Sequence, residues 1–312
     1  MEFIRGSQNL KPDHHGCVAT IGNFDGLHLG HQAVIRQVMN KGKELHLPVV
    51  VITFEPQPQE YFCPDDVPAR LTRLREKLEV LKELQVDRVL CLRFNKQLAS
   101  LTADQFVQQI LVDGLGIKYL VVGDDFKFGK GRTGDFDYLT SIASELGFEV
   151  SDTHSFIFAE QRVSSTRIRN ALEEGDLLLA KQMLGRDYGM AGRVAHGDKR
   201  GRTIGFPTAN IYLHRKSSPV YGVYSVHLHS KHPQIGGRIL NGIANVGQRP
   251  TVGGTRTLLE VHLFDFDADI YGAYVDVTFL QKIRDEHRFE SFEALKAQIE
   301  RDVEQATAFF AS

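Results

Sequence analysis

The stretch Gly22-Asn23-Phe24-Asp25-Gly26-Leu27-His28-Leu29-Gly30-His31 decides how the N-terminal half of this chain folds. It follows an apolar, β-rich run, Cys17 to Ile21, and leads into a segment of helical period, Gln32 to Leu45. A strand that passes through a glycine-containing turn into a helix is how a βαβ unit begins. The glycines let the backbone approach a ligand closely, and the amide groups at the start of the helix favour phosphate.

Two histidines in this stretch are candidates for chemistry. His28 and His31 are three residues apart, so on a helical turn they face the same way. Two imidazoles in that arrangement could donate hydrogen bonds to the charge that develops on a phosphoryl group in transfer. The alternative is that they only cap a helix or fill a gap, which is the weaker interpretation for a His-x-Gly-His at a strand-to-helix junction.

Apolar runs alternate with segments of helical period from Gly16 to about Asp152, a pattern typical of an α/β doubly wound parallel sheet. Ligands bind such sheets beyond the carboxyl ends of the strands, so the loops after Ile21, Phe54 and Gly123 are the expected places for chemistry. The further strands that we predict are Pro48 to Phe54, Arg88 to Phe94, Tyr119 to Gly123 and Phe148 to Ser151, and the further helices are Leu71 to Leu84, Thr102 to Leu111 and Phe136 to Leu146.

After about Gly185 short alternating strands follow one another with Gly or Pro turns between them, which is typical of an antiparallel barrel or sandwich. The length of 312 residues favours two domains. Because a helical segment up to Leu184 ends the first, the predicted domains are residues 1–184 and 185–312. The clearest strands are Gly222 to His229, Arg238 to Val246, Leu258 to Phe264 and Val275 to Leu280, with a terminal helix from about Phe292 to Phe310.

The composition excludes several classes of protein. Hydrophobic residues make up 42% and charged residues 24%, as in ordinary globular proteins, and the net charge is −2, which argues against a nucleic-acid partner. The three cysteines form no CxxC pair, which suits a reducing compartment. Since the first residues lack a signal-peptide pattern and no run of about 18 apolar residues occurs, we expect a cytoplasmic protein without a membrane partner.

Four stretches together resemble the bacterial bifunctional riboflavin kinase and FAD synthetase, within the nucleotidyltransferases marked by His-x-Gly-His. The resemblance covers almost the entire chain. It implies a Rossmann-like N-terminal domain that adenylylates FMN to FAD, and a C-terminal β-barrel domain that phosphorylates riboflavin to FMN. ATP is then the co-substrate and Mg²⁺ the cofactor of both reactions. The four stretches are Gly22 to His31, Thr53 to Pro56, Gly123 to Gly129 and Ser164 to Arg169.

The resemblance also implies roles for single residues. His28 and His31 would contact the ATP phosphates with the help of Asn23. The family commonly has His where this chain has Gln57, which leaves Gln57 a flavin-contact or structural role. Hydroxyls and a guanidinium at a helix start form a good anion clamp, although alone they fit an ordinary N-cap equally well. The implied ATP-binding residues are Gly22, Gly30, Ser164, Ser165, Thr166 and Arg167, and the implied flavin-binding residues are Phe62 and Asp125.

A second candidate site lies in the β-rich half, at the basic loop Gly197 to Phe206 and the Pro-Thr-Ala-Asn that follows it. Such a loop can wrap phosphates, and Thr208 and Asn210 offer oxygen ligands to Mg²⁺. Read alone, it is better explained as a solvated loop before a strand. Its likeness to the Pro-Thr-Ala-Asn motif of riboflavin kinases reverses that balance, and implies ATP binding by Gly201 and Thr203 and flavin binding by Arg249.

Glu260 is the predicted general base of this second site. Along its strand, Leu259, Val261 and Leu263 form one face and leave Glu260 on the other with His262. A carboxylate there could accept the proton of the ribityl 5′-hydroxyl of riboflavin as it attacks the γ-phosphate of ATP. A glutamate in a strand most often only faces solvent. The prediction of a general base at Glu260 therefore depends on the resemblance to riboflavin kinases.

Other signals are weaker. Gly129 to Gly134 fits GxGxxG, but begins too far from the preceding strand for a dinucleotide fingerprint. The basic residues Arg73, Arg75 and Lys77 alternate with leucines, so we expect them on the solvated side of a helix. Two alternatives to the bifunctional enzyme stay open: a chain in which one site is active, and a flavin-binding regulator on the same fold. The oligomeric state is also open.

Overall fold

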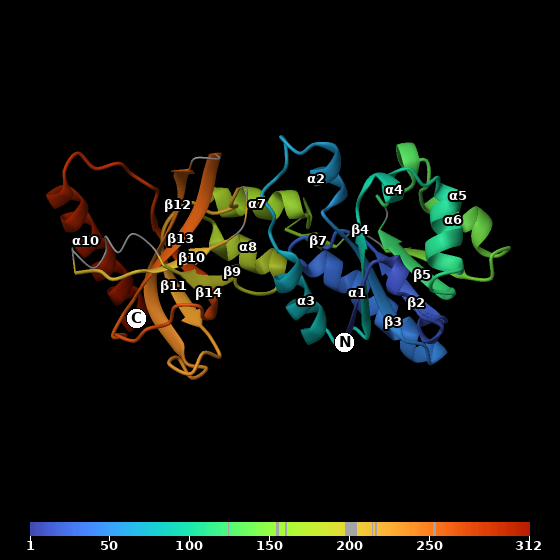
Figure 1. Cartoon of the computed structure of the whole chain (residues 1–312), viewed down its shortest axis with the longest axis horizontal. Coiled ribbons are helices and arrows are strands. Elements are labelled where there is room, and N and C mark those ends of the chain that lie inside the picture. The colour runs from blue at the N-terminus through green and yellow to red at the C-terminus, as the bar shows by residue number, and fades with distance from the viewer. Residues whose placement is uncertain are drawn as a thin grey trace. The chain divides into compact units, whose positions relative to one another are not determined.

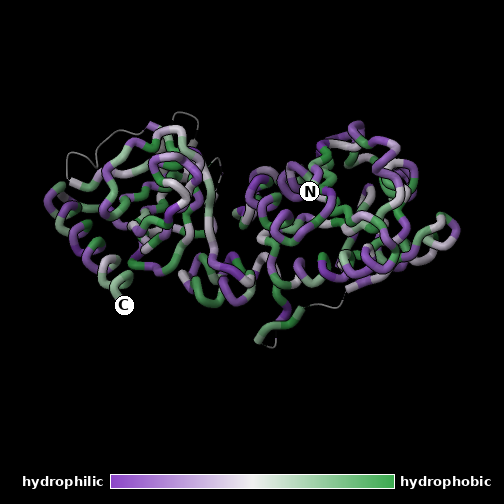
Figure 2. Tube along the Cα trace, turned by 90° about the horizontal axis from the view of Figure 1, so that it is seen from below, coloured by the Kyte–Doolittle hydropathy of each residue, from purple (hydrophilic) through white to green (hydrophobic). Residues whose placement is uncertain are grey.

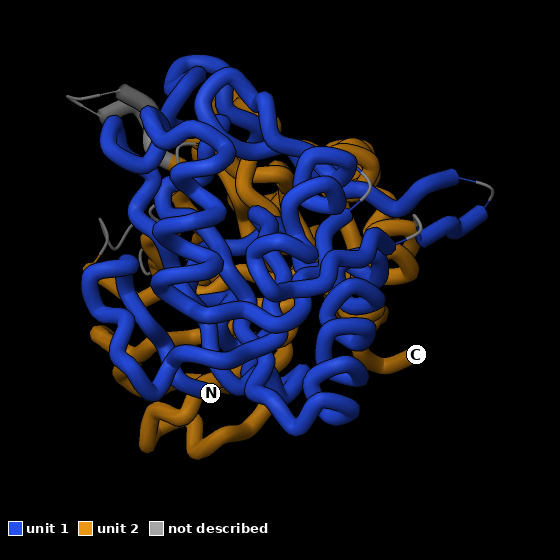
Figure 3. The backbone as a smooth tube through the Cα atoms, turned by 90° about the vertical axis from the view of Figure 1, so that its right-hand side faces the viewer, with its two compact units in different colours: residues 1–68, 72–164 blue, residues 69–71, 165–312 orange. Residues whose placement is uncertain are grey.

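The structure is a computed structural model that describes residues 1–123, 125–153, 156–159, 161–196, 205–213, 215, 217–251 and 254–312, without the side chains of 249–251 and 254–256. The chain forms two compact units, residues 1–68 with 72–164 and residues 69–71 with 165–312 (Figure 3). In both units hydrophobic residues follow the central strands, and hydrophilic segments lie mainly outside (Figure 2).

A six-stranded parallel sheet forms the centre of the first unit, in the order β1-β4-β3-β2-β5-β6. Its helices cover both faces (Figure 1): residues of α1 and α3 pack on one face, and those of α5, the π-helical turn after it and α6 on the other. The predicted doubly wound fold is therefore confirmed. The strands are β1 (Glu2–Arg5), β2 (Cys17–Ile21), β3 (Val49–Glu55), β4 (Arg88–Arg93), β5 (Ile117–Gly123) and β6 (Glu149–Thr153).

The predicted helices of the first unit occur in the expected order, with changed bounds, and the short helices α2 and α4 were not predicted. The helix expected at Thr102 to Leu111 divides into α5 and the π-helical turn Val107–Val112, and the helix expected from Leu71 begins at Leu74. The helices are α1 (Leu29–Leu45), α2 (Pro58–Phe62), α3 (Leu74–Glu83), α4 (Lys96–Ala99), α5 (Ala103–Phe106) and α6 (Phe136–Ala143), and a hairpin of β7 (Ile157–Phe158) and β8 (Gln161–Arg162) follows β6.

Residues 69–71 belong to the second unit because its side chains hold their carbonyl groups. Arg169 Nε donates to the Ala69 oxygen at 2.6 Å, and Arg215 Nη1 donates to the Arg70 oxygen at 2.6 Å. The Tyr188 hydroxyl donates to the Leu71 oxygen at 3.3 Å. The carbonyl groups of this stretch accept these bonds, and α3 starts after it, at Leu74.

The second unit is a closed antiparallel barrel in the order β10-β13-β12-β11-β14-β9, and the pairing of β9 with both β10 and β14 closes it. The predicted barrel is thus confirmed, and the sandwich is excluded. Ala306 of the terminal helix α10 packs on Val223 and Ile243 of the barrel. The elements are α7 (Ser165–Glu174), α8 (Leu177–Leu184), β9 (Gly189–Ala195), β10 (Ala209–Tyr212), β11 (Gly222–His229), β12 (Ile239–Thr251), β13 (Gly254–Leu263), β14 (Tyr274–Arg284) and α10 (Phe292–Ala311).

Candidate active sites

The first candidate site lies at the carboxyl edge of the parallel sheet, where β2 stands between β3 and β5. From β2 the chain runs to β3 on one side, and β5 continues to β6 on the other. A parallel sheet binds its ligands at such a switch point. All five residues of β2 are buried, so the strand is a rigid base for the loop that follows it.

The loop between β2 and α1 has a conformation that local sequence does not favour. Phe24 and Leu27 both have positive φ, 47° and 45°, which costs energy in residues other than glycine. Contacts from outside the loop stabilise it. The Thr72 backbone N–H donates to Asp25 Oδ1 at 2.9 Å, and the Gly26 N–H donates to the Thr72 hydroxyl at 2.9 Å.

The two predicted catalytic histidines lie together at the start of α1. Their rings stack with centroids 3.6 Å apart and planes 16° from parallel. His28 is the N-cap residue, and its Nδ1 accepts a hydrogen bond from the His31 backbone N–H at 3.3 Å. Because Nδ1 accepts, neutral His28 carries its proton on Nε2, which makes Nε2 a donor. His28 therefore caps the helix and still keeps a donor for a ligand.

His31 is held in its neutral form. Burial lowers the pKa of His31 well below its usual 6.5, and electrostatic interactions with His28, Lys77 and Arg162 lower it further. Its Nδ1 is buried and, within the part of the chain that the structure describes, has no hydrogen-bond partner. The ring also meets Phe24 edge to face at 5.3 Å, which fixes its orientation.

The position of Lys77 differs from the one expected from the sequence. We expected it on the solvated side of a helix, but its side chain is only 2% exposed, whereas Arg75 is exposed as expected. Its Nζ donates to the carbonyl oxygen of Asn23 and to the Thr53 hydroxyl. Alternation with leucines marks a helix but does not show which polar residue turns inward, because the partners of Lys77 lie far away in sequence.

Asn23, Gly22 and Gly30 take different positions around the histidines. Asn23 is exposed, and Gly22 and Gly30 are partly buried. A Cβ atom added at Gly30 would lie 3.1 Å from His28 Nδ1, so the absence of a side chain leaves room for the ring. Their predicted roles in ATP binding and catalysis stay predictions.

The predicted flavin residues lie in the segments that follow β3 and β5. Phe62, at the end of α2, is 61% exposed, and its ring lies 5.6 Å from that of Phe94, which follows β4. Asp125 makes an ion pair with Arg162 at 3.1 Å. Arg162 was not singled out from the sequence. The β7–β8 hairpin places Arg162 close to Asp125 and His31, and no local sequence motif indicates this position.

Gln57 stands where the family commonly has His. It is the N-cap residue of α2 and 8% exposed. Its Nε2 is buried and has no hydrogen-bond partner in the described ranges. A buried amide donor without a partner costs free energy unless a ligand or water completes it. Either role left open for Gln57, flavin contact or structural support, is compatible with this position.

The predicted triphosphate clamp occupies the junction before α7. Ser164 ends the first unit, whereas Ser165, Thr166 and Arg167 open α7 in the second. Thr166 is exposed and the other three are partly buried. Their binding of ATP stays a prediction.

The second candidate site is a row of polar residues across three barrel strands. Glu260 of β13 lies opposite Asn210 of β10 and opposite Asn245 of β12. Residues opposite each other on neighbouring strands project from the same face. The expected alternation is present, because Leu259 and Val261 are buried in the barrel and Glu260 is only partly buried.

His262 extends this row beyond Glu260. Its Nδ1 donates to the carbonyl oxygen of Pro207 at 2.8 Å, which ties β13 to the segment before β10. Its ring also meets Phe206 edge to face at 5.4 Å. These contacts fix the Pro-Thr-Ala-Asn segment against the strand that carries Glu260.

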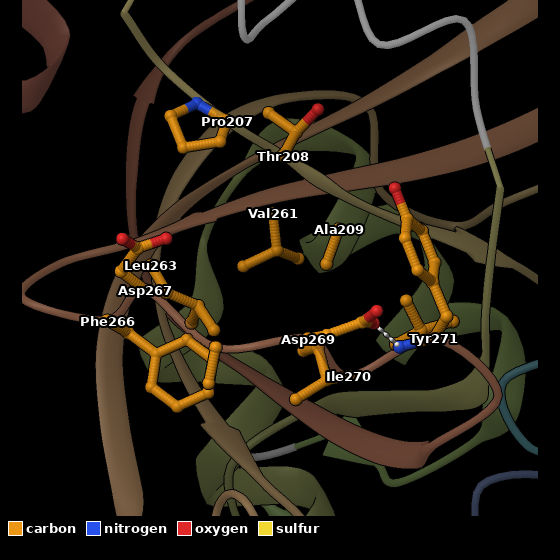
Figure 4. A pocket seen from close by; sticks show the side chains of 12 residues that line it. Pro207, Thr208, Ala209, Val261, Leu263, Phe266, Asp267, Asp269, Ile270 and Tyr271 are labelled. Carbon is orange, nitrogen blue, oxygen red and sulfur yellow. Dashed lines mark hydrogen bonds between the residues drawn. The ribbon is translucent and has the colours of Figure 1, made fainter.

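A cavity of about 370 Å³ adjoins the predicted metal ligand Thr208 (Figure 4). Ala209, Val261 and Leu263 supply its apolar wall, and Asp269 and Tyr271 its polar side. The Tyr271 backbone N–H donates to the Asp269 carboxylate at 2.9 Å. Of the other predicted residues, Gly201 and Thr203 lie outside the described residues, as does the side chain of Arg249.

Comparison with known proteins connects both sites to one family. The family model for FAD synthetase matches residues 10–167, and that for riboflavin kinase matches residues 184–310. The bifunctional riboflavin kinase/FMN adenylyltransferase of Haemophilus influenzae is 52% identical over the full length of both chains. The chain belongs to this family. The relative with the same description from Escherichia coli K12 is 50% identical and covers 99% of this chain and 98% of its own.

A solved structure matches the fold across both units of this family member. It is described as a macrolide-efflux protein from Streptococcus pneumoniae, is 31% identical, covers 98% of this chain and 99% of its own, and has a TM-score of 0.82. None of the helices in the described ranges is long and apolar enough to cross a membrane. Among the described residues, no group of three or more His, Cys, Asp or Glu could hold a metal ion.

Proposed function

We propose that this bifunctional enzyme makes FAD in two steps, with FMN formed at the barrel row around Glu260 and adenylylated at the Asn23–His31 loop. On this proposal the first activity belongs to residues 185–312 and the second to residues 1–184. The observation that carries the second assignment is the stacked pair His28 and His31, at the N-terminus of a helix that begins at the end of the central strand.

In the adenylyl step a phosphate oxygen of FMN attacks the α-phosphorus of ATP, and the bond to the β-phosphate breaks to release pyrophosphate. The reaction needs no protein nucleophile, so the protein contributes positioning and electrostatics. His28 donates from Nε2 toward the phosphate, while the N-terminal amides of α1 add positive potential. Asn23, exposed in the same loop, donates from its amide. By the family resemblance, Ser164, Ser165, Thr166 and Arg167 would bind the triphosphate.

In the kinase step the ribityl 5′-oxygen of riboflavin attacks the γ-phosphorus of ATP, its proton passes to Glu260, and ADP leaves. Thr208 also lines a cavity of about 370 Å³ whose apolar walls and polar side are typical of small-molecule sites. The Thr208 hydroxyl and the Asn210 amide are oxygen donors of the kind Mg²⁺ prefers, and they would hold it. Bound there, Mg²⁺ would neutralise phosphate charge. ATP use and three cysteines that form no disulfide are consistent with work in the cytoplasm.

One experiment with three variants tests both assignments. Purified protein is incubated with Mg²⁺, ATP and either riboflavin or FMN, and the flavins are separated by chromatography. His28→Ala and His31→Ala are expected to lower FAD formation by ~10² to 10³ while FMN still forms. Glu260→Gln is expected to lower FMN formation by ~10² to 10⁴ while added FMN still becomes FAD.

Each variant controls for the folding of the other, because the unaffected reaction reports an intact chain. Normal FAD formation by His28→Ala and His31→Ala would remove the first assignment, and normal FMN formation by Glu260→Gln would remove the second. Leaving out Mg²⁺ is expected to stop both reactions in the parent enzyme.

A further inference from the structure

A buried cation lies beneath the loop that carries Asn23 and His28. Lys77 projects from the first half of α3, and its side chain is 2% exposed. Its position on the helix, three residues after Leu74 and four before the buried Leu81, belongs to the apolar face. Lysine is rarely buried unless its ammonium group is satisfied by polar partners. This inward position calls for an explanation beyond helix packing.

The partners of Lys77 belong to the site. Its Nζ donates to the carbonyl oxygen of Asn23 at 2.5 Å and to the hydroxyl of Thr53 at 3.3 Å. Asn23 is the second residue after β2, and Thr53 is a fully buried residue near the end of β3. The ammonium group therefore connects α3, the loop after β2 and the neighbouring strand at the carboxyl edge of the sheet.

The same part of α3 supports the loop at a second point. Thr72, just before the helix, bonds Asp25 and Gly26 through its backbone and hydroxyl. Phe24, between these two supports, has positive φ, so the loop depends on them to keep its shape. Asn23 is thus held by Lys77 on one side of the strained residue, and Asp25 by Thr72 on the other.

We infer that Lys77 is a positioning residue for adenylyl transfer: its buried ammonium group fixes the Asn23 backbone, and so aims Asn23 and the following histidines at the nucleotide. The inference rests on the proposed adenylyl site. Lys77 acts through the loop and touches no reacting atom. Its charge has a second effect, because it helps to keep the pKa of His31 below the usual range, after burial and His28.

The test replaces Lys77 by a neutral side chain of similar length. Lys77→Met is expected to lower the kcat of FAD formation by about 10- to 100-fold, since a misplacement of about 1 Å can cost about 10²-fold. The KM for FMN should change little, and FMN formation from riboflavin should stay at the parent level. Lys82→Met is the matched control, because Lys82 lies exposed on the same helix, and it should behave like the parent.

A pH profile separates positioning from general damage. Removal of the Lys77 charge lets the pKa of His31 rise, so His31 becomes protonated at a higher pH. The acid limb of FAD formation is therefore expected to move to higher pH in Lys77→Met. A merely structural defect would lower the rate at every pH and leave the limb in place, which would overturn the inference.

Thr53→Val gives a second test if Lys77→Met does not fold. It removes one hydroxyl partner of Lys77 with little change of shape, and should lower FAD formation by about tenfold, the equivalent of one hydrogen bond to a charged group. FAD formation within twofold of the parent in a folded Lys77→Met, or in Thr53→Val, overturns the inference. If His28→Ala and His31→Ala also form FAD at the parent rate, the proposed adenylyl site is wrong. If these two variants are impaired while Lys77→Met is not, the site stands and only the role of Lys77 is wrong.

Discussion

Gly30→Ala should separate the stability of the enzyme from its FAD synthesis. Gly30 is the second residue of α1, where alanine favours the helix by up to about 1 kcal/mol. The added Cβ, however, would lie 3.1 Å from His28 Nδ1 and 3.2 Å from His28 Cε1. Ordinary contacts between such atoms begin near about 3.5 Å, so the ring must move by roughly 0.4 Å.

The His28 ring has little room to make this shift. It is 6% exposed, and its stacked partner His31 lies at 3.6 Å. Its Nδ1 also accepts the hydrogen bond that caps α1, already long at 3.3 Å, and loss of a cap costs about 1 kcal/mol. The cap loss offsets the helix propensity gained, so we expect the melting temperature to change by only a few degrees.

Activity should respond much more strongly than stability. A displaced His28 is expected to lower FAD formation by about 10-fold, and by ~10² to 10³ if the donor leaves the phosphate altogether. The assay is FAD formation from FMN and ATP, with FMN formation from riboflavin as the internal control. FAD formation within threefold of the parent would show that the ring tolerates the methyl group, and would refute the reasoning from this contact.

Two further predictions concern stability. Asp302, 3% exposed, accepts from Arg284 Nε at 2.9 Å and from Arg284 Nη2 at 2.8 Å, and Asp302→Ala should cost about 3 kcal/mol of stability. Asp285→Ala, which removes an exposed ion pair with Lys282, should cost much less. Urea unfolding followed by circular dichroism measures both, because the chain has no Trp. Because the folded pKa of His31 lies well below its unfolded 6.5, the unfolded chain binds more protons below about pH 6.5. The first unit should therefore lose stability as the pH falls below about 6.5, and His31→Gln should weaken this pH dependence. Equal slopes of melting temperature against pH in the parent and in His31→Gln would contradict this prediction.

The sequence predicted the elements whose own residues carry a strong pattern. β2 and β11 have the predicted bounds, because continuous apolar or alternating residues mark buried strands. β1 was missed: it has four residues and only Ile4 is buried, so its strand identity comes from pairing with β4. β9 was missed too, since its glycines and alanines give little alternation.

The same distinction applies to the sites. His28, His31 and Glu260 could be singled out because each lies in a motif of a few residues. The structure places the two histidines in contact, and the catalytic roles of all three residues stay predictions. Arg162 and the inward position of Lys77 could not, because their neighbours lie tens of residues away. The geometry around a motif depends on tertiary contacts that no local pattern records.

This dependence has a consequence for the adenylyl site. A loop with two non-glycine residues at positive φ does not hold its shape through local preferences, so its geometry has to come from the residues that bond it. Two of those residues, Thr72 and Lys77, lie within one turn and a half of each other around the start of α3. The orientation of the histidines is therefore determined by residues that lie about 40 to 50 positions later in the sequence. On this reasoning, substitutions at the start of α3 should affect FAD synthesis as directly as substitutions in the loop itself.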